Sequence, residues 1–291
     1  MKSKNAELLQ QLTEVTTGLE FPWSDSSDPI NPFLWEVATQ GEFTIENLLR
    51  SETPNFDFYA EGGKFMRIIN LDDYIEDIWQ KTETHKTVIE LLKNNTLFLE
   101  AAEIRLLHDP HLPDTFNIML GLTKSGEWIG ISPQIQGECR EYNPTGEYTV
   151  GSSLLPVYQP QTAENIKLLT QLETLLKDLD FYEPNFYEGF TDKGYVVKLG
   201  KTRELMLNNL LDAIGFARTF PFRQFTPVSE YEDDFDEDYI QAYQALDNFL
   251  ESKFSNLYMY LLGISCCYCI YVIGETEDGD FAGVTSMAAW S

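Results

Sequence analysis

Two histidines near the middle of the chain are the first residues whose spacing could serve chemistry. His108 and His111 flank Asp109 and Pro110, and nowhere else in the sequence do two histidines lie close together. Two imidazoles and a carboxylate could bind a metal ion, but a stable site needs a further strong ligand. The proline and the missing ligand favour an exposed turn, so we expect no metal site of the chain's own.

The four cysteines are the second candidate, and they do not form a disulfide framework. They are Cys139, Cys266, Cys267 and Cys269. Neighbouring residues of a strand point to opposite faces, so Cys266 and Cys267 cannot act together. No histidine stands near them to complete a metal site. The pattern favours small, buried, apolar side chains.

Acidic side chains are so numerous that no pair of them stands out as a catalytic acid and base. The run 230–238 has the look of a calcium loop, but it lacks the glycine at the sixth position and the regularly spaced oxygen ligands. It is better placed to supply acids to the first turn of a helix predicted over 239–253. The chain also lacks a phosphate-binding loop and a Gly-x-Ser-x-Gly motif. These observations predict neither an enzyme nor a bound cofactor.

The net charge is the strongest signal in the composition. The 291 residues include 47 Asp and Glu against 20 Lys and Arg, which gives a net charge of −27. The acids are evenly spread, with 25 acids against 11 bases through Gln161 and 22 against 9 after it. Such a field repels nucleic acids and anionic membranes, attracts basic proteins, and also favours solubility. We therefore expect a basic protein partner, with no nucleic acid and no membrane.

Two patterns recur along the chain. The stretch 272–285 repeats the glycines, threonine, aromatic and β-branched positions of 119–132 at a constant offset of 153. The stretch 5–21 returns as 165–181 at an offset of 160, with its leucines in the same places. One pattern is typical of an amphipathic helix and the other of a hairpin, in which Gly279 can supply the positive φ of a tight turn. A helix at one end and a hairpin at the other indicate duplication of a whole domain.

The periodicity between these repeats predicts the remaining elements and a domain plan. Helices are expected over 5–19, 44–51, 72–80, 85–94, 165–179, 202–218 and 239–253. Strands are expected over 32–37, 64–71, 99–107, 115–122, 127–135, 194–199, 257–262, 264–275 and 280–290. The stretch 137–162, rich in glycine and proline, reads as a linker between domains at 1–136 and 163–291. The predicted fold class is α/β (α+β): two tandem α/β sandwich domains, each a largely antiparallel sheet with flanking helices.

At both ends of the chain the motifs resemble one family, the nuclease A inhibitors of cyanobacteria and their relatives. These are small acidic proteins that block a non-specific DNA/RNA endonuclease. The first copy carries the family-like opening, Leu8-Leu9-x-Gln11-Leu12, and the later motif Phe33-Leu34-Trp35-Glu36. The second copy carries the family-like ending from Asn256-Leu257 through 271–285, but it has Tyr195-Val196-Val197-Lys198 in place of the Phe-Leu-Trp-Glu motif.

The resemblance implies a protein that blocks a nuclease by mimicking its acidic substrate. In the family, an acid of the loop after the first helix and the extreme C-terminal residue enter the metal-containing cleft. The loop acid maps best to Asp25 and less well to Asp28, and the second copy offers Glu183 and Glu188. The terminal residue maps to Ser291, whose carboxylate and hydroxyl would present hard oxygens to the nuclease's metal.

Two interpretations remain open at this point. The chain is either an inhibitor of a non-specific endonuclease or an acidic interaction module that has kept the fold without inhibiting. The features of one working inhibitor are divided between the copies, since the linker follows the last strand of the first copy. A cytoplasmic location is expected, because the N-terminus lacks a signal-peptide core and the longest apolar run, 261–274, is short and broken by glycine.

Overall fold

A computed structural model of the chain places its helices and strands in two compact units. The structure describes residues 3–22, 24, 27–52, 64–105, 115–134, 158–177, 179–180, 194–226, 236–264 and 267–289. Unit 1 combines the described residues of Met1–Phe43 with those of Arg218–Ser291. Unit 2 combines those of Thr44–Gly137 with those of Leu155–Ala217. Each unit is therefore assembled from segments far apart in the sequence.

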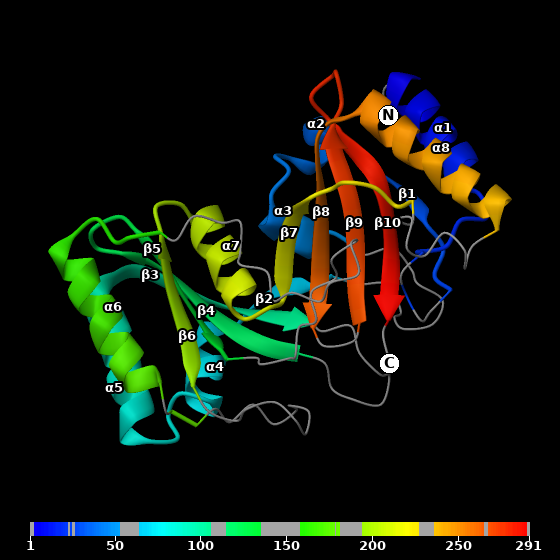
Figure 1. Cartoon of the computed structure of the whole chain (residues 1–291). Helices are drawn as coiled ribbons and strands as arrows, with labels where there is room; N and C mark the ends of the chain where they lie inside the picture. The colour runs from blue at the N-terminus through cyan, green and yellow to red at the C-terminus, as the bar shows by residue number, and fades with distance from the viewer. Residues whose placement is uncertain are drawn as a thin grey trace. The chain divides into compact units, whose positions relative to one another are not determined.

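Unit 1 is a five-stranded sheet with two long helices packed on one face (Figure 1). The strand order is β1-β10-β9-β8-β7, and the pairs β1–β10, β10–β9 and β9–β8 are antiparallel. Its elements are α1 (Ser3–Thr16), β1 (Asn31–Trp35), α2 (Val37–Gln40), β7 (Ala217–Pro221), α8 (Glu237–Lys253), β8 (Ser255–Ile264), β9 (Cys267–Glu275) and β10 (Phe281–Ala289).

Unit 2 repeats the same plan with its own five-stranded sheet. The strand order is β2-β3-β4-β5-β6, and every pairing is antiparallel. Its elements are α3 (Ile45–Arg50), β2 (Met66–Ile69), α4 (Leu71–Asp77), α5 (Glu83–Asn95), β3 (Thr96–Arg105), β4 (Thr115–Thr123), β5 (Trp128–Pro133), α6 (Ala163–Leu176), β6 (Tyr195–Gly200) and α7 (Arg203–Ala213). The predicted α+β class, with two antiparallel sheets and flanking helices, is confirmed.

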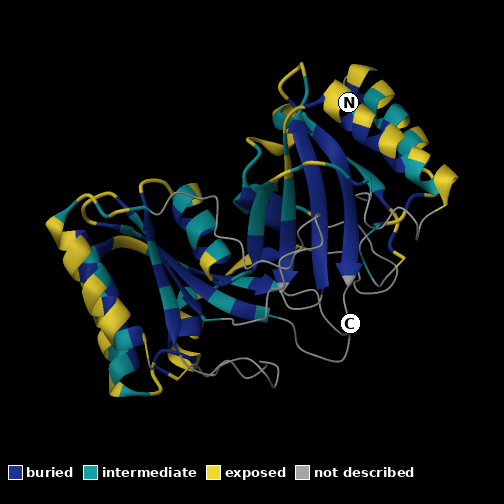
Figure 2. Cartoon of the chain, in the orientation of Figure 1, coloured by how far each residue is buried: buried dark blue, intermediate teal, exposed yellow. Residues whose placement is uncertain are grey.

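The core of unit 1 lies between its helices and one face of its sheet. Leu12 of α1 and Leu246 of α8 pack against alternate residues of β9 and β10, such as Ile270 and Val284. Figure 2 shows the strands β9 and β10 buried and the outward surfaces of α1 and α8 exposed. The opposite face of the sheet is aromatic, because Phe43 stacks on Phe281 with ring centroids 4.8 Å apart. Helices that read as amphipathic in the sequence therefore do cover a sheet.

The helix predicted over 202–218 is shorter than expected. It begins after Thr202, whose hydroxyl caps the first turn by accepting the Leu205 N–H, and it ends at Ala213. Gly215 then adopts a positive φ of 76°, which ends the helix, and β7 starts two residues later. The sequence prediction missed β7 because its residues, Ala-Arg-Thr-Phe-Pro, show neither a continuous apolar run nor clear alternation.

The units differ from the successive domains that the sequence predicted at 1–136 and 163–291. The sheet of unit 1 begins with β1 from the first copy and continues with four strands of the second. The sheet of unit 2 ends with β6 from the second copy and takes its other strands from the first. The two copies have exchanged their first helix and first strand: β1 of the first copy pairs with β10 of the second, and β6 of the second copy pairs with β5 of the first. In the structure each unit thus combines elements of both copies.

Candidate functional site

The loop between α1 and β1 is closed at its base by backbone hydrogen bonds. The Ile30 N–H donates to the Leu19 carbonyl at 2.8 Å, and the Phe21 N–H donates to the Asp28 carbonyl at 2.9 Å. Leu19, Phe21 and Ile30 belong to the core of unit 1, so the base of the loop cannot shift without disturbing that core. Loops held in this way on a rigid scaffold are common carriers of function.

This loop is tied to the far end of β10. The Ser286 hydroxyl lies 3.2 Å from the Asp28 carbonyl and 3.1 Å from the Pro29 carbonyl, where it can donate to either. Ser286 is buried, and the strand continues for three residues beyond it to Ala289. The acidic loop of the first copy and the closing strand of the second copy therefore meet in unit 1.

The Asp28 side chain is buried at this junction, with 8% of its surface exposed. Its Oδ2 atom finds no hydrogen-bond partner among the described residues. Burial raises the pKa of the nearby Cys269 thiol to about 12, and the charge of Asp28 acts in the same direction. Hydrogen bonds with Tyr271 and Thr285 act in the opposite direction. Cys269 is therefore a thiol at neutral pH, the less nucleophilic form of the side chain.

The predicted contact residues differ in what the structure says of them. Asp28 alone belongs to the described part of the chain. Asp25, Glu183, Glu188, Ser291 and the histidine pair lie outside the described residues. Asp25 belongs to the same loop as Asp28, and Ser291 follows the last residue of β10 by two positions. Glu183 and Glu188 belong to the corresponding loop of unit 2, whose base is closed by the Gly194 N–H donating to the Leu179 carbonyl at 2.8 Å.

A buried asparagine and a buried acid join the helix and the hairpin of unit 1. Asn5 Nδ2 donates to Asp280 Oδ2 and to Glu36 Oε1, both at 3.0 Å. The other oxygen of Asp280 accepts the Val37 N–H at 3.0 Å. Asn5 and Asp280 are each only 2% exposed. Buried polar groups need such partners, so this network fixes α1 and β1 against the β9–β10 turn.

Unit 2 repeats this network with its own residues. Asn165 Nδ2 donates to the Glu127 carboxylate, and to the Thr123 hydroxyl at 3.3 Å. Glu127 also accepts from the Tyr158 hydroxyl at 2.5 Å and from the Gln161 N–H at 3.0 Å. Burial alone would raise the pKa of Glu127, but hydrogen bonds from Tyr158, Asn165 and Gln161 outweigh it and lower the pKa. Burial and the hydrogen bond to Glu127 raise the pKa of Tyr158 to about 12.

Sequence reasoning missed Asp280 and Glu127. They occupy the same position of the repeated hairpin pattern, directly after Gly279 and Gly126, and both are acidic. Asn5 and Asn165 likewise open the repeated helix pattern. A polar residue that recurs at equivalent positions within two apolar patterns was the signal that could have revealed them.

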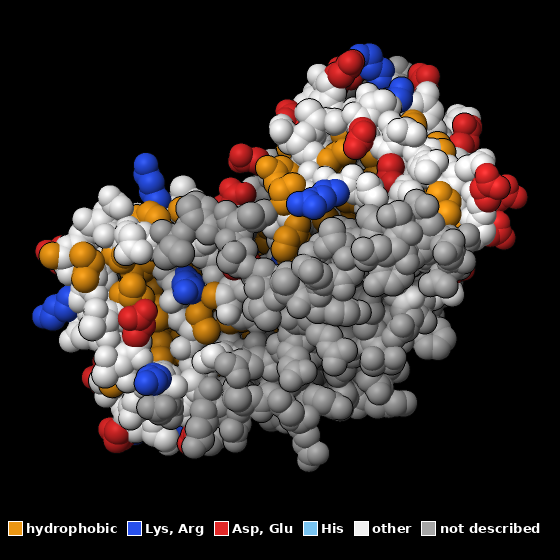
Figure 3. Space-filling view, in the orientation of Figure 1, with side chains coloured by type: hydrophobic (Ala, Val, Ile, Leu, Met, Phe, Trp, Pro, Cys, Tyr) orange, Lys and Arg blue, Asp and Glu red, His pale blue; other side chains and the backbone are white. Residues whose placement is uncertain are grey.

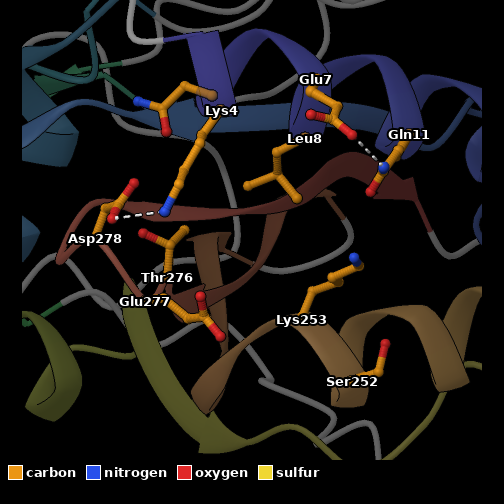
Figure 4. A pocket seen from close by; sticks show the side chains of 10 residues that line it. Lys4, Glu7, Leu8, Gln11, Ser252, Lys253, Thr276, Glu277 and Asp278 are labelled. Atoms are coloured by element: carbon orange, nitrogen blue, oxygen red, sulfur yellow. Dashed lines mark hydrogen bonds and ion pairs between the residues drawn. The ribbon is translucent and has the colours of Figure 1, made fainter.

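A shallow hollow lies at the opposite end of the unit 1 sheet, beside the β9–β10 turn (Figure 4). Its volume is about 300 Å³, and α1, the end of α8 and the turn line it. Figure 4 shows Lys4 reaching Asp278, at 3.3 Å, and Glu7 beside Gln11. All of its charged residues are exposed, and the buried polar side chain that lines it, Asn5, already donates to Glu36 and Asp280.

Metal binding and membrane spanning find no support in the described part of the chain. No group of three or more His, Cys, Asp or Glu side chains there could hold a metal ion. No helix among the same residues is long and apolar enough to cross a membrane. In the face drawn in Figure 3, Asp and Glu side chains are spread over both units and interspersed with Lys and Arg. The two signs of charge are therefore mixed on the described surface in that view.

Comparison with protein families gives a match. The model of a protein family described as nuclease A inhibitor-like protein matches residues 6–109 and 212–288, which together make up more than half of the chain. The first match begins in α1 and the second ends in β10. No curated protein was found to match the chain.

Proposed function

Because the chain belongs to the family of nuclease A inhibitor-like proteins, we propose that it is a protein inhibitor of a non-specific DNA/RNA endonuclease. It acts by occupying the nuclease's basic, metal-containing cleft with acidic groups in place of the substrate. The chain itself is then a blocking protein and not a catalyst. The observation that carries the proposal is the loop 20–29, which Ser286 ties to the end of β10 in unit 1.

The contact is assigned to the loop acid Asp25 and to Ser291, with Asp28 holding the base of the loop. Asp28 is 8% exposed, so its carboxylate could meet a partner only after the loop had opened. Its carbonyl accepts from both Phe21 and Ser286, which makes Asp28 a fixed point of the loop. A loop whose base is fixed before binding loses less conformational entropy when the complex forms.

The acidity of the chain supports the electrostatic part of the proposal. A net charge of −27 favours encounter with a positively charged cleft over an extended distance. It also disfavours direct binding to nucleic acid, which carries the same sign of charge. The metal in the complex belongs to the nuclease, and the oxygens that approach it belong to this chain.

Titration of the chain into a magnesium-dependent, non-specific endonuclease tests the proposal. Cleavage of double-stranded DNA is expected to fall in proportion to added protein and to stop near equimolar amounts. Asp25→Asn should weaken inhibition strongly. Asp77→Asn removes the same charge from the exposed end of α4 and should leave inhibition unchanged. Cleavage that persists at a large excess of the chain would instead favour an acidic module that binds without inhibiting.

A further inference from the structure

The exchange of segments between the copies determines how many nuclease sites a chain can offer. We propose that the chain forms one nuclease-binding site, in unit 1, and that unit 2 is a structural counterpart without a second site. This inference rests on the proposed function and goes beyond it, because it fixes the stoichiometry of the complex. It also predicts that the site joins residues from both copies.

Unit 1 brings together the two parts that the sequence divides between copies. The loop 20–29 comes from the first copy, and β10 comes from the second. They are joined by the β1–β10 pairing, in which Asn31 lies opposite Thr285. The Ser286 hydroxyl adds a bond to the loop itself. The base of the loop and β10 thus form one continuous part of the fold.

Unit 2 lacks this junction in three respects. At the constant offset of 153, Ser286 corresponds to Pro133, which has no hydroxyl to hold a loop. The corresponding loop, 180–193, is longer than 20–29. Beyond β5 the chain runs on towards α6, and its first residue, Gln134, donates its N–H to the Gly194 carbonyl at 3.0 Å. The chain that follows β5 is thus bonded to the base of the loop.

Native mass spectrometry of the full chain with a threefold excess of the endonuclease measures the stoichiometry directly. One nuclease per chain is the expected result. Two nucleases per chain would overturn the inference and leave the proposed function intact, since both sites would then inhibit. Absence of any complex, together with absence of inhibition, would overturn the proposed function itself.

Variants of the two loops locate the site. Asp25→Asn is expected to weaken binding about 100-fold by calorimetry, whereas the double variant Glu183→Gln, Glu188→Gln should change it less than about twofold. The reverse ranking would place the site in unit 2 and refute the inference.

A matched pair of buried serines tests the junction. Ser286→Ala removes the hydroxyl that holds the loop and should weaken binding about tenfold. Ser132→Ala removes a hydroxyl that is equally buried near the end of β5, where it donates to the Pro133 carbonyl, and should leave affinity unchanged. Circular dichroism of both variants checks that they are folded. Equal affinities for the two variants would show that the loop does not depend on β10.

Discussion

Replacing Asn5 with alanine should loosen strands that lie 275 positions away in the sequence. The Asn5 Nδ2 atom donates to the buried Asp280 carboxylate at 3.0 Å, and alanine leaves that carboxylate with one donor fewer. A hydrogen bond to a charged group contributes about 2 kcal/mol, and a buried carboxylate has no water to replace it. The free energy of opening unit 1 should therefore fall by about 2 kcal/mol, which is roughly a 30-fold rise in its open population.

Hydrogen exchange followed by mass spectrometry can read this effect separately in each unit. In Asn5→Ala, amides of β9 and β10 should exchange roughly 30-fold faster, whereas those of β4 and β5 keep their wild-type rates. The mirror variant Asn165→Ala removes the donor to Glu127 and should give the opposite pattern. Asn94→Ala, at an exposed position near the end of α5, serves as the control and should alter neither hairpin.

The result that refutes this reasoning is faster exchange in β4 and β5 of Asn5→Ala. That outcome would mean that α1 packs on the hairpin of its own copy, so that the copies fold as successive domains. The two arrangements predict opposite patterns from the same substitution.

Three further outcomes are expected. If charge steers association, the rate of association with the nuclease should fall about tenfold between 10 and 150 mM salt, because the Debye length shortens from about 30 to about 8 Å. Stopped flow measures this rate, and a constant rate would leave solubility as the role of the acids. Because the pKa of Glu127 lies below its ordinary value of 4.5, Glu127 stabilises unit 2 above that pH and loses this contribution as the pH falls through the lowered pKa. In Glu127→Gln, the free energy of unfolding should therefore depend less steeply on pH in the acid range. Gly283→Ala should lower the free energy of unfolding in urea by about 3 kcal/mol, because the added Cβ would lie 1.9 Å from the Val272 carbonyl oxygen. Gly279→Ala, at a φ of 77° but with open space for the Cβ, should lower it by about 1 kcal/mol.

Local structure was largely predictable, because periodicity and turn chemistry act over short distances. The hairpin turn expected at Gly279 has the positive φ that the sequence demanded, and Gly126 has the same conformation in unit 2. The apolar stripe of α1 placed Leu12 in the core, where it is fully buried. Local prediction failed where periodicity is weak, as at β7, whose five residues Ala-Arg-Thr-Phe-Pro give no clear strand pattern.

The exchange itself could not be read from the sequence, for a physical reason. Asn5 and Asn165 are the same residue, and Asp280 and Glu127 both present a carboxylate, so either helix could bond either hairpin. The exchanged and unexchanged arrangements would contain nearly the same contacts within each unit. The choice between them depends on the connecting segments, whose closure entropy changes only slowly with length.

The candidate site depends on this choice. Read as successive domains, the chain has its best loop acid in the first copy and Ser291 in the second, and neither copy holds a complete site. In the exchanged arrangement β1 pairs with β10, and both parts belong to unit 1. Within unit 1, β10 would be an unpaired edge strand without β1, and Asp280 would lose the donor that Asn5 supplies. Duplication followed by exchange thus makes the second copy dependent on the first, which is why we expect two copies of the domain to act as one inhibitor.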